Sequence, residues 1–172
     1  SAGSATITAT VTGIPATSAT VTIGTAVQGP SVKAIVNGAS FQTTIAPGSW
    51  ISIYIDQTAP AASVASQLPL PTTLGGYRIL VNGSAIPVYA VQPLAGGTQL
   101  NAQLPYEVAP GSAQVVVESA GVPSAAFPFT VQAAAPGIFV FGDNRAVVQN
   151  VLPDNSLVVN TADTPVPAGD YI

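Results

Sequence analysis

The sequence predicts an all-β protein: an immunoglobulin-like β-sandwich, preceded by an N-terminal β-hairpin or arm and followed by a partial second β unit. Many short segments alternate apolar with hydroxyl-bearing side chains, which is typical of strands that bury one face. Turn signals separate these segments about every ten residues, as in sandwich proteins. The chain also carries 16 glycines and 16 prolines, which leave few windows long enough for a helix.

Residues 1–28 are expected to form a β-hairpin that serves as a donor arm. Threonines alternate with apolar residues over positions 5–11, and the same pattern returns over 19–23 after a turn at 13–15. The apolar positions of each strand share one face. We expect these side chains to mediate assembly: Ile7, Ala9, Val11, Val21 and Ile23.

Residues 29–133 carry the strands of the predicted sandwich. Asn82-Gly83 is a strong hairpin signal, because both turn positions need positive φ. Pro87 predicts an edge or a bulge, since proline donates no hydrogen bond. One or two helical turns are expected near residues 59–67. Strands are expected at residues 32–36, 49–55, 77–81, 85–91, 98–103, 113–118 and 126–131.

Residues 134–172 are expected to be a β extension or an incomplete second immunoglobulin-like unit, with short strands at 138–141, 146–150 and 157–160. Residues 48–51 (Gly-Ser-Trp-Ile) are matched by residues 169–172 (Gly-Asp-Tyr-Ile). The match predicts that a second copy of the sandwich begins here. Tyr171 and Ile172 therefore join the residues expected to take part in assembly.

Five short motifs occur in an order that resembles a known family. They are residues 36–41 (Val-Asn-Gly-Ala-Ser-Phe), 45–53 (Ile-Ala-Pro-Gly-Ser-Trp-Ile-Ser-Ile), 68–76 with 81–83, 104–111 and 135–139. Over residues 33–172 the chain resembles an uncharacterised, Solibacter-type C-terminal domain family of large secreted acidobacterial proteins. The resemblance implies IPT/TIG-like immunoglobulin-type repeats and an extracytoplasmic address.

The chain departs from this family in two places. Residues 56–58 (Asp-Gln-Thr) replace the family's Gly-Thr-Asn-Leu-like turn. The family also continues into a second sandwich past the positions that match Gly169 and Asp170. The match does not include residues 1–28, which resemble the closing hairpin of a different bacterial immunoglobulin-like domain or form a free arm.

The charge content argues against two classes of partner. Charged residues make up 6% of the chain, against about 25% in soluble domains, with three basic and seven acidic residues. Nucleic-acid binding needs clustered basic residues, and the sequence has no such cluster. No apolar run approaches the ~20 residues of a membrane span. We therefore expect neither nucleic-acid binding nor membrane insertion.

The residue types also argue against catalysis. The sequence has no His and no Cys, so it offers no imidazole base, no thiol nucleophile and no common zinc or iron site. Glu107 and Glu118 would have to serve as a glycosidase pair, although two solvated strand-end charges is the favoured interpretation. We expect a non-enzymatic protein with no catalytic residue, no cofactor and no metal site.

Weaker candidates remain open. Asp143-Asn144 and Asp154-Asn155 suit calcium, but such pairs more often form turns. Lys33 suits either an isopeptide crosslink or simple solvation. Trp50 and Tyr54, which share a strand face, form a candidate ligand platform together with Tyr77 and Tyr89; core packing is the competing role.

Two functions fit these observations. The first is a pilus-like structural subunit outside the cell or on the surface of a bacterium, which assembles with other copies into a fibre or surface layer by β-strand exchange. The second is a spacer, or a carbohydrate- or protein-binding adhesion module, within a larger cell-surface protein. A hairpin that packs within its own chain would favour the second function.

Overall fold

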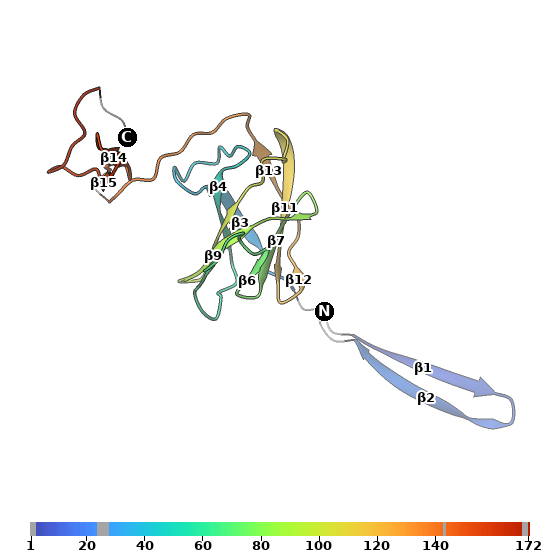
Figure 1. Ribbon diagram of the computed structural model, residues 1–172. Coiled ribbons are helices and arrows are strands. Elements are labelled where there is room, and N and C mark those ends of the chain that lie inside the picture. The colour runs from blue at the N-terminus through green and yellow to red at the C-terminus, as the bar shows by residue number, and fades with distance from the viewer. Residues whose placement is uncertain (1–2, 24–27, 143, 170–171) are drawn as a thin grey trace.

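The computed structural model describes residues 3–23, 28–142, 144–169 and 172, and the regular elements of these residues are all β-strands. The predicted all-β class is confirmed (Figure 1). The strands are β1 (Gly3–Val11), β2 (Ile14–Ile23), β3 (Val32–Asn37), β4 (Trp50–Ile55), β5 (Ser63–Val64), β6 (Thr73–Leu74), β7 (Tyr77–Val81), β8 (Ser84–Ala85), β9 (Val88–Leu94), β10 (Gly97–Gln103), β11 (Gly111–Ser119), β12 (Val122–Pro123), β13 (Phe127–Val131), β14 (Gln149–Val151) and β15 (Leu157–Val159).

Strands β3 to β13 form two facing sheets. One sheet has the strand order β3-β4-β10-β9-β5. In the other sheet, β7 and β11 pair with each other at the centre. Strands β6 and β8 pair with β7, and strands β12 and β13 pair with β11. The seven longer strands of these sheets follow the immunoglobulin arrangement: β3, β4, β10 and β9 take the A-B-E-D places, and β7, β11 and β13 take the C-F-G places. The predicted immunoglobulin-like sandwich is therefore confirmed.

The core lies between these two sheets. Strand β4 supplies Ile51, Ile53 and Ile55, none more than 3% exposed, and so confirms the alternation that the sequence predicts. From the opposite sheet, Ile79 and Val117 are both fully buried. Burying one such side chain contributes about 1.5–3 kcal/mol, so this double layer holds the sandwich together.

The chain changes sheets at Ile86 and Pro87. Strand β8 pairs with β7, whereas β9 pairs with β10 in the other sheet. Pro87 lacks an N–H and cannot extend a ladder, while Ile86 fills the core at the crossing with no exposed area. The single strand predicted at 85–91 is therefore wrong; two strands in different sheets replace it.

The helical turns predicted near residues 59–67 are also wrong. The N–H of Ala59 donates to Thr98 Oγ1 at 2.7 Å, and the N–H of Ala65 donates to the Tyr89 carbonyl at 2.8 Å. Between them, Ser63–Val64 forms strand β5 on β9. Hydrogen bonds to neighbouring strands thus satisfy the backbone of this segment in place of a helix.

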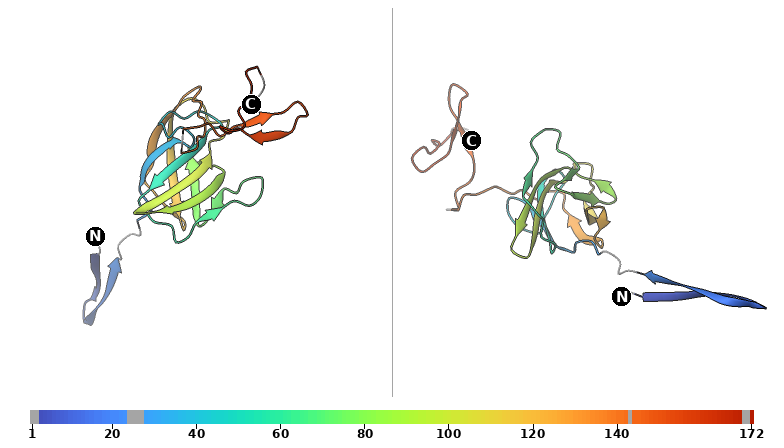
Figure 2. Two further views of the ribbon diagram at one scale, coloured as in Figure 1. Left: turned by 90° about the vertical axis from the view of Figure 1, so that its left-hand side faces the viewer. Right: turned by 90° about the horizontal axis from the view of Figure 1, so that it is seen from below.

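The hairpin β1–β2 stands clear of the sandwich. Figure 2 shows it projecting beyond one end, with β14–β15 at the opposite end. The turn lies at Thr12–Gly13, with φ of 86° at Gly13, so Ile14 and Pro15 begin β2 rather than form the turn predicted at 13–15.

Two of the three strands predicted in the C-terminal part are present, at 149–151 where 146–150 was expected and at 157–159 where 157–160 was expected. Residues 138–141 form no strand, and only an isolated bridge joins Val140 to Ala146. Strands β14 and β15 pair around Asn150, a buried side chain that donates to the Thr164 carbonyl at 2.7 Å and accepts from Asn160 at 2.8 Å. The proposal that this part belongs to a second immunoglobulin-like unit stays a prediction.

Candidate functional site

The first candidate surface is the aliphatic side of the hairpin, here called the hairpin face and defined by Ile7, Ala9, Ala19 and Val21. The register pairs Ile7 with Ala19, whereas Thr6 pairs with Thr20 and Thr8 with Ser18. Directly opposed residues share a sheet face, so one side of the ribbon is mainly aliphatic, with Thr17 opposite Ala9, and the other carries hydroxyl groups. The predicted grouping of Ile7, Ala9 and Val21 is therefore present.

The hairpin face is open to solvent. Side chains 6–21 are all exposed, with Ile7 at 65% and Val21 at 48%. A two-stranded ribbon with no packing partner is at best marginally stable in water. Residues 1–28 also contain no charged residue to discourage further strand pairing. These features are typical of a strand pair that packs against another protein surface.

The other predicted assembly residues are less informative. Val11 is 63% exposed and pairs with Ile14 beyond an irregularity in the register. Ile23 ends β2 opposite Gly3. Ile172 is 69% exposed, and Tyr171 lies outside the described residues.

A groove lies between the edge strands β3 and β13, and we call it the edge groove. Its volume is about 430 Å³, and Ala34, Ile35, Phe127 and Phe129 contribute to its lining. Both phenylalanines are partly buried against the core. Strand β3 pairs with β4 and β13 pairs with β11, so both strands end their sheets here. The edge groove is therefore a mixed opening of the sandwich, in which two phenylalanines lie beside Lys33, threonines and Gln132.

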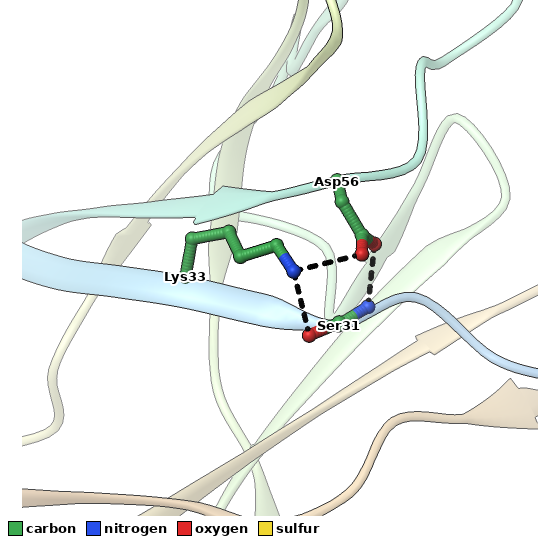
Figure 3. Close-up of polar contacts among 3 residues, drawn as sticks. All are labelled: Ser31, Lys33 and Asp56. Atoms are coloured by element: carbon green, nitrogen blue, oxygen red, sulfur yellow. Dashed lines mark hydrogen bonds and ion pairs between the residues drawn. The ribbon is translucent and has the colours of Figure 1, made fainter.

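Lys33 lies near one end of the edge groove and takes part in a polar clamp (Figure 3). Its Nζ is 3.0 Å from Asp56 Oδ2 and donates to Ser31 Oγ at 3.1 Å; Asp56 Oδ1 accepts the Ser31 N–H at 2.7 Å. The Ser31 N–H, followed by Lys33, lowers the pKa of Asp56 below its ordinary 3.8. Both charged side chains are about half exposed, at 57% and 44%, so they form a solvated ion pair. Lys33 therefore lies in an exposed ion pair, which agrees with the solvated role, and the isopeptide crosslink stays a prediction.

The second candidate surface is the aromatic groove, a depression of about 520 Å³ on the outer side of the sheet β3-β4-β10-β9-β5. Trp50 of β4 and Tyr89 of β9 meet there edge to face, with ring centroids 5.4 Å apart and an interplanar angle of 67°. Phe41 and Phe139 add two further rings to its lining. A ligand could therefore reach four aromatic side chains in one place.

The ligand platform predicted from the sequence is partly wrong. Tyr54 does not line the aromatic groove. Tyr77 is 2% exposed and belongs to the core, because it points inward from β7. The partner of Trp50 is Tyr89, which lies two strands away in the same sheet.

A polar cluster on the floor of the aromatic groove was not predicted from the sequence. Ser52 Oγ donates to Asn101 Oδ1 at 2.9 Å, and Gln99 Nε2 donates to Asn101 Oδ1 at 2.8 Å and to Ser52 Oγ at 3.3 Å. A signal was present in the sequence: Gln99 and Asn101 alternate with Leu100 and Ala102. That spacing places both amides on the outer face of β10.

The remaining candidates show no shared site. Glu118 pairs with Arg78 at 3.4 Å near the end of β11, while Glu107 precedes that strand. From the start of β11 to Glu118 the strand rises roughly 20 Å, so Glu107 and Glu118 lie toward opposite ends of it.

The calcium site expected from Asp143-Asn144 and Asp154-Asn155 stays a prediction. Asp154 Oδ1 accepts the Ser156 N–H at 3.0 Å, as in a turn, and Asp143 lies outside the described residues. Within the part of the chain that the structure describes, no three His, Cys, Asp or Glu side chains come together as metal ligands do. Nor do those residues include a helix long and apolar enough to cross a membrane.

Comparisons with known proteins return little. No protein-family model matches the chain, and no curated protein matches it. Among solved structures, the chain is similar to the Lin-41 filamin domain, with 15% sequence identity and a TM-score of 0.34 over 62% of this chain and 100% of that one. The strand order given above, rather than this similarity, assigns the immunoglobulin-like fold.

Proposed function

We propose that this chain is a non-enzymatic structural module of a bacterial surface or extracellular assembly, in which the hairpin β1–β2 of one copy completes the sandwich of the next. The observation that supports this proposal is the hairpin face, with Ile7 65% and Val21 48% exposed. An aliphatic ribbon of this kind gains about 25 cal/mol for each Å² of apolar area that it buries.

The edge groove supplies the acceptor in this proposal. A strand added beside β3, or beside the part of β13 that precedes the Ile45–Val131 bridge, would bond to backbone groups and direct alternate side chains inward. Phe127 and Phe129 would then receive Ile7 and Val21, because period-two alternation places these two aliphatic residues on the same side of the ribbon. The threonines of the other face would remain in water.

Donor and acceptor lie on different parts of one chain, so the contact is head to tail. Contacts of this type propagate into open filaments unless the rotation between neighbours closes a ring. The low charge content, 6% of residues, lowers the electrostatic repulsion between neighbouring copies. The resemblance to a family of secreted proteins favours a location outside the cytoplasm.

The test is to measure assembly of the full chain by light scattering and negative-stain electron microscopy over a range of concentrations. Ile7→Lys should abolish assembly, because it places a charge on the hairpin face. Thr8→Lys is the matched control: it adds the same charge to the same strand, but on the hydroxyl face. It should leave assembly intact.

Two outcomes contradict the proposal. A wild-type chain that stays monomeric at every concentration rules out exchange between copies. Equal loss of assembly in both lysine variants shows that added charge, rather than the hairpin face, controls association. In either case the hairpin would be better interpreted as part of a neighbouring domain or as a passive spacer.

A further inference from the structure

The aromatic groove presents two ring systems at an angle on a rigid support. Trp50 and Tyr89 come from strands on either side of β10, and 37% and 43% of their respective surfaces are exposed. Their 67° interplanar angle makes a corner rather than a stack. Exposed aromatic side chains held by the strands of one sheet offer apolar contact area at little cost in conformational entropy.

The polar cluster between these rings is only partly satisfied. Asn101 uses its Oδ1 to accept from both Ser52 and Gln99, and Gln99 uses its Nε2 to donate to both neighbours. Within the described residues, Asn101 Nδ2 and Gln99 Oε1 make no hydrogen bond. The internal bonds therefore fix both amides and leave one free donor and one free acceptor.

The aromatic groove contains no charge. Its lining residues include aromatic, small, aliphatic, hydroxyl and amide side chains, but no Asp, Glu, Lys or Arg. A charged ligand would lose its hydration without gaining a counter-ion, which is costly. The groove therefore favours a neutral ligand that combines apolar faces with groups able both to donate and to accept.

From these features we propose that the aromatic groove binds a neutral glycan. A sugar ring offers a C–H face to the aromatic rings, and each of its hydroxyls is both donor and acceptor. One hydroxyl would accept from Asn101 Nδ2 and a neighbouring hydroxyl would donate to Gln99 Oε1. The volume of about 520 Å³ lies within the usual range of small-molecule sites and suits a short oligosaccharide segment.

The C-terminal segment forms one wall of this site. Phe139 and Val140 line the aromatic groove, and the chain leading to them is held by a 3.2 Å bond from Asn37 Nδ2 to the Ala135 carbonyl. The site lies on the outer face of the sheet β3-β4-β10-β9-β5 and uses no residue of the hairpin. It is therefore independent of the proposed assembly, and each can fail without the other.

The experiment uses the single tryptophan of the chain as its reporter, because Trp50 lies in the aromatic groove. The full chain is titrated with soluble β-1,4-glucan, β-1,4-linked N-acetylglucosamine and α-mannan hexasaccharides. An oligogalacturonate serves as the charged comparison and a proline-rich peptide as the competing class of ligand. We expect a saturable change in Trp50 fluorescence with at least one neutral glycan and none with oligogalacturonate.

Substitutions then test whether the residues of the aromatic groove bind the glycan. Gln99→Ala and Asn101→Ala should each weaken glycan binding by about fivefold or more, and Tyr89→Ala by about tenfold. Gln92→Ala is the matched control, because Gln92 is the cross-strand partner of Gln99 but does not line the groove. Its affinity should be unchanged. Thermal unfolding measured by circular dichroism verifies that every variant is folded.

Three results overturn the proposal. The first is that no neutral glycan in the panel binds at millimolar concentration. The second is that only the proline-rich peptide changes the fluorescence of Trp50. The third is that Gln92→Ala weakens binding as much as Gln99→Ala does.

Discussion

The rings of Trp50 and Tyr89 pack edge to face at 5.4 Å although strand β10 separates their own strands. Such aromatic pairs contribute about 0.5–1.5 kcal/mol beyond the area that they bury. We predict a coupling free energy of this size in a double-mutant cycle of Trp50→Ala and Tyr89→Ala, measured by urea unfolding. Additive effects of the two changes would show that the rings do not stabilise each other.

Thr98 is expected to stabilise the segment that follows β4. It is completely buried, accepts the Ala59 N–H at 2.7 Å and donates to the Gln57 carbonyl at 2.7 Å. Thr98→Val keeps the shape but leaves both backbone groups unpaired, which should cost about 2–4 kcal/mol in the free energy of unfolding. Thr98→Ser keeps the hydroxyl and should cost distinctly less. Equal losses in both variants would assign the effect to packing alone.

The clamp at Asp56 predicts a pH dependence of stability. The pKa of this carboxyl is lowered, first by the Ser31 N–H and then by Lys33. A carboxyl with a lowered folded pKa stabilises the fold above its unfolded pKa, and this contribution is lost as the pH falls through the folded value. Wild type should therefore exceed Asp56→Asn in urea midpoint at pH 7, and the difference should vanish well below 3.8, the ordinary pKa of the group. A difference that persists unchanged in acid would contradict this origin.

Gly29 lies where the chain enters the sandwich, and it has no room for a side chain. A Cβ at this position would clash with the backbone carbonyl of Pro123, which cannot rotate away. We expect Gly29→Ala to lower the free energy of unfolding by about 1–3 kcal/mol, as overpacking does. Gly142→Ala is the control, because its Cβ would meet open space. Urea unfolding that gives the same loss for both would refute the steric explanation.

Much of the sandwich could be predicted because its signals are local. Alternation over β4 separates Ile51, Ile53 and Ile55 from Trp50, and the Asn82-Gly83 turn adopts φ of 49° and 83°, as its sequence requires. Such patterns determine which residues share a face. They do not determine which face is covered, because that depends on a partner sheet formed by distant residues.

The predictions that proved wrong share one cause, which is that local patterns do not encode contacts between distant parts of the chain. The change of sheets at Pro87 and the β structure of residues 59–67 both depend on pairing with strands that are distant in the sequence. Tyr77 and Tyr89 are the same type of residue and both lie in strands, yet one is buried and the other lies beside Trp50. The aromatic groove also needs Phe139, which follows the sandwich in the chain. No local period could have assembled these residues.

Hydrogen exchange of the full chain at low and high concentration tests strand complementation most directly. Backbone amides of β1 and β2 that point away from the partner strand exchange freely in an isolated ribbon. Strand complementation predicts that these amides become protected as concentration rises, together with amides on the free edge of β3 or β13. Exchange of the hairpin amides that is fast and independent of concentration would contradict it.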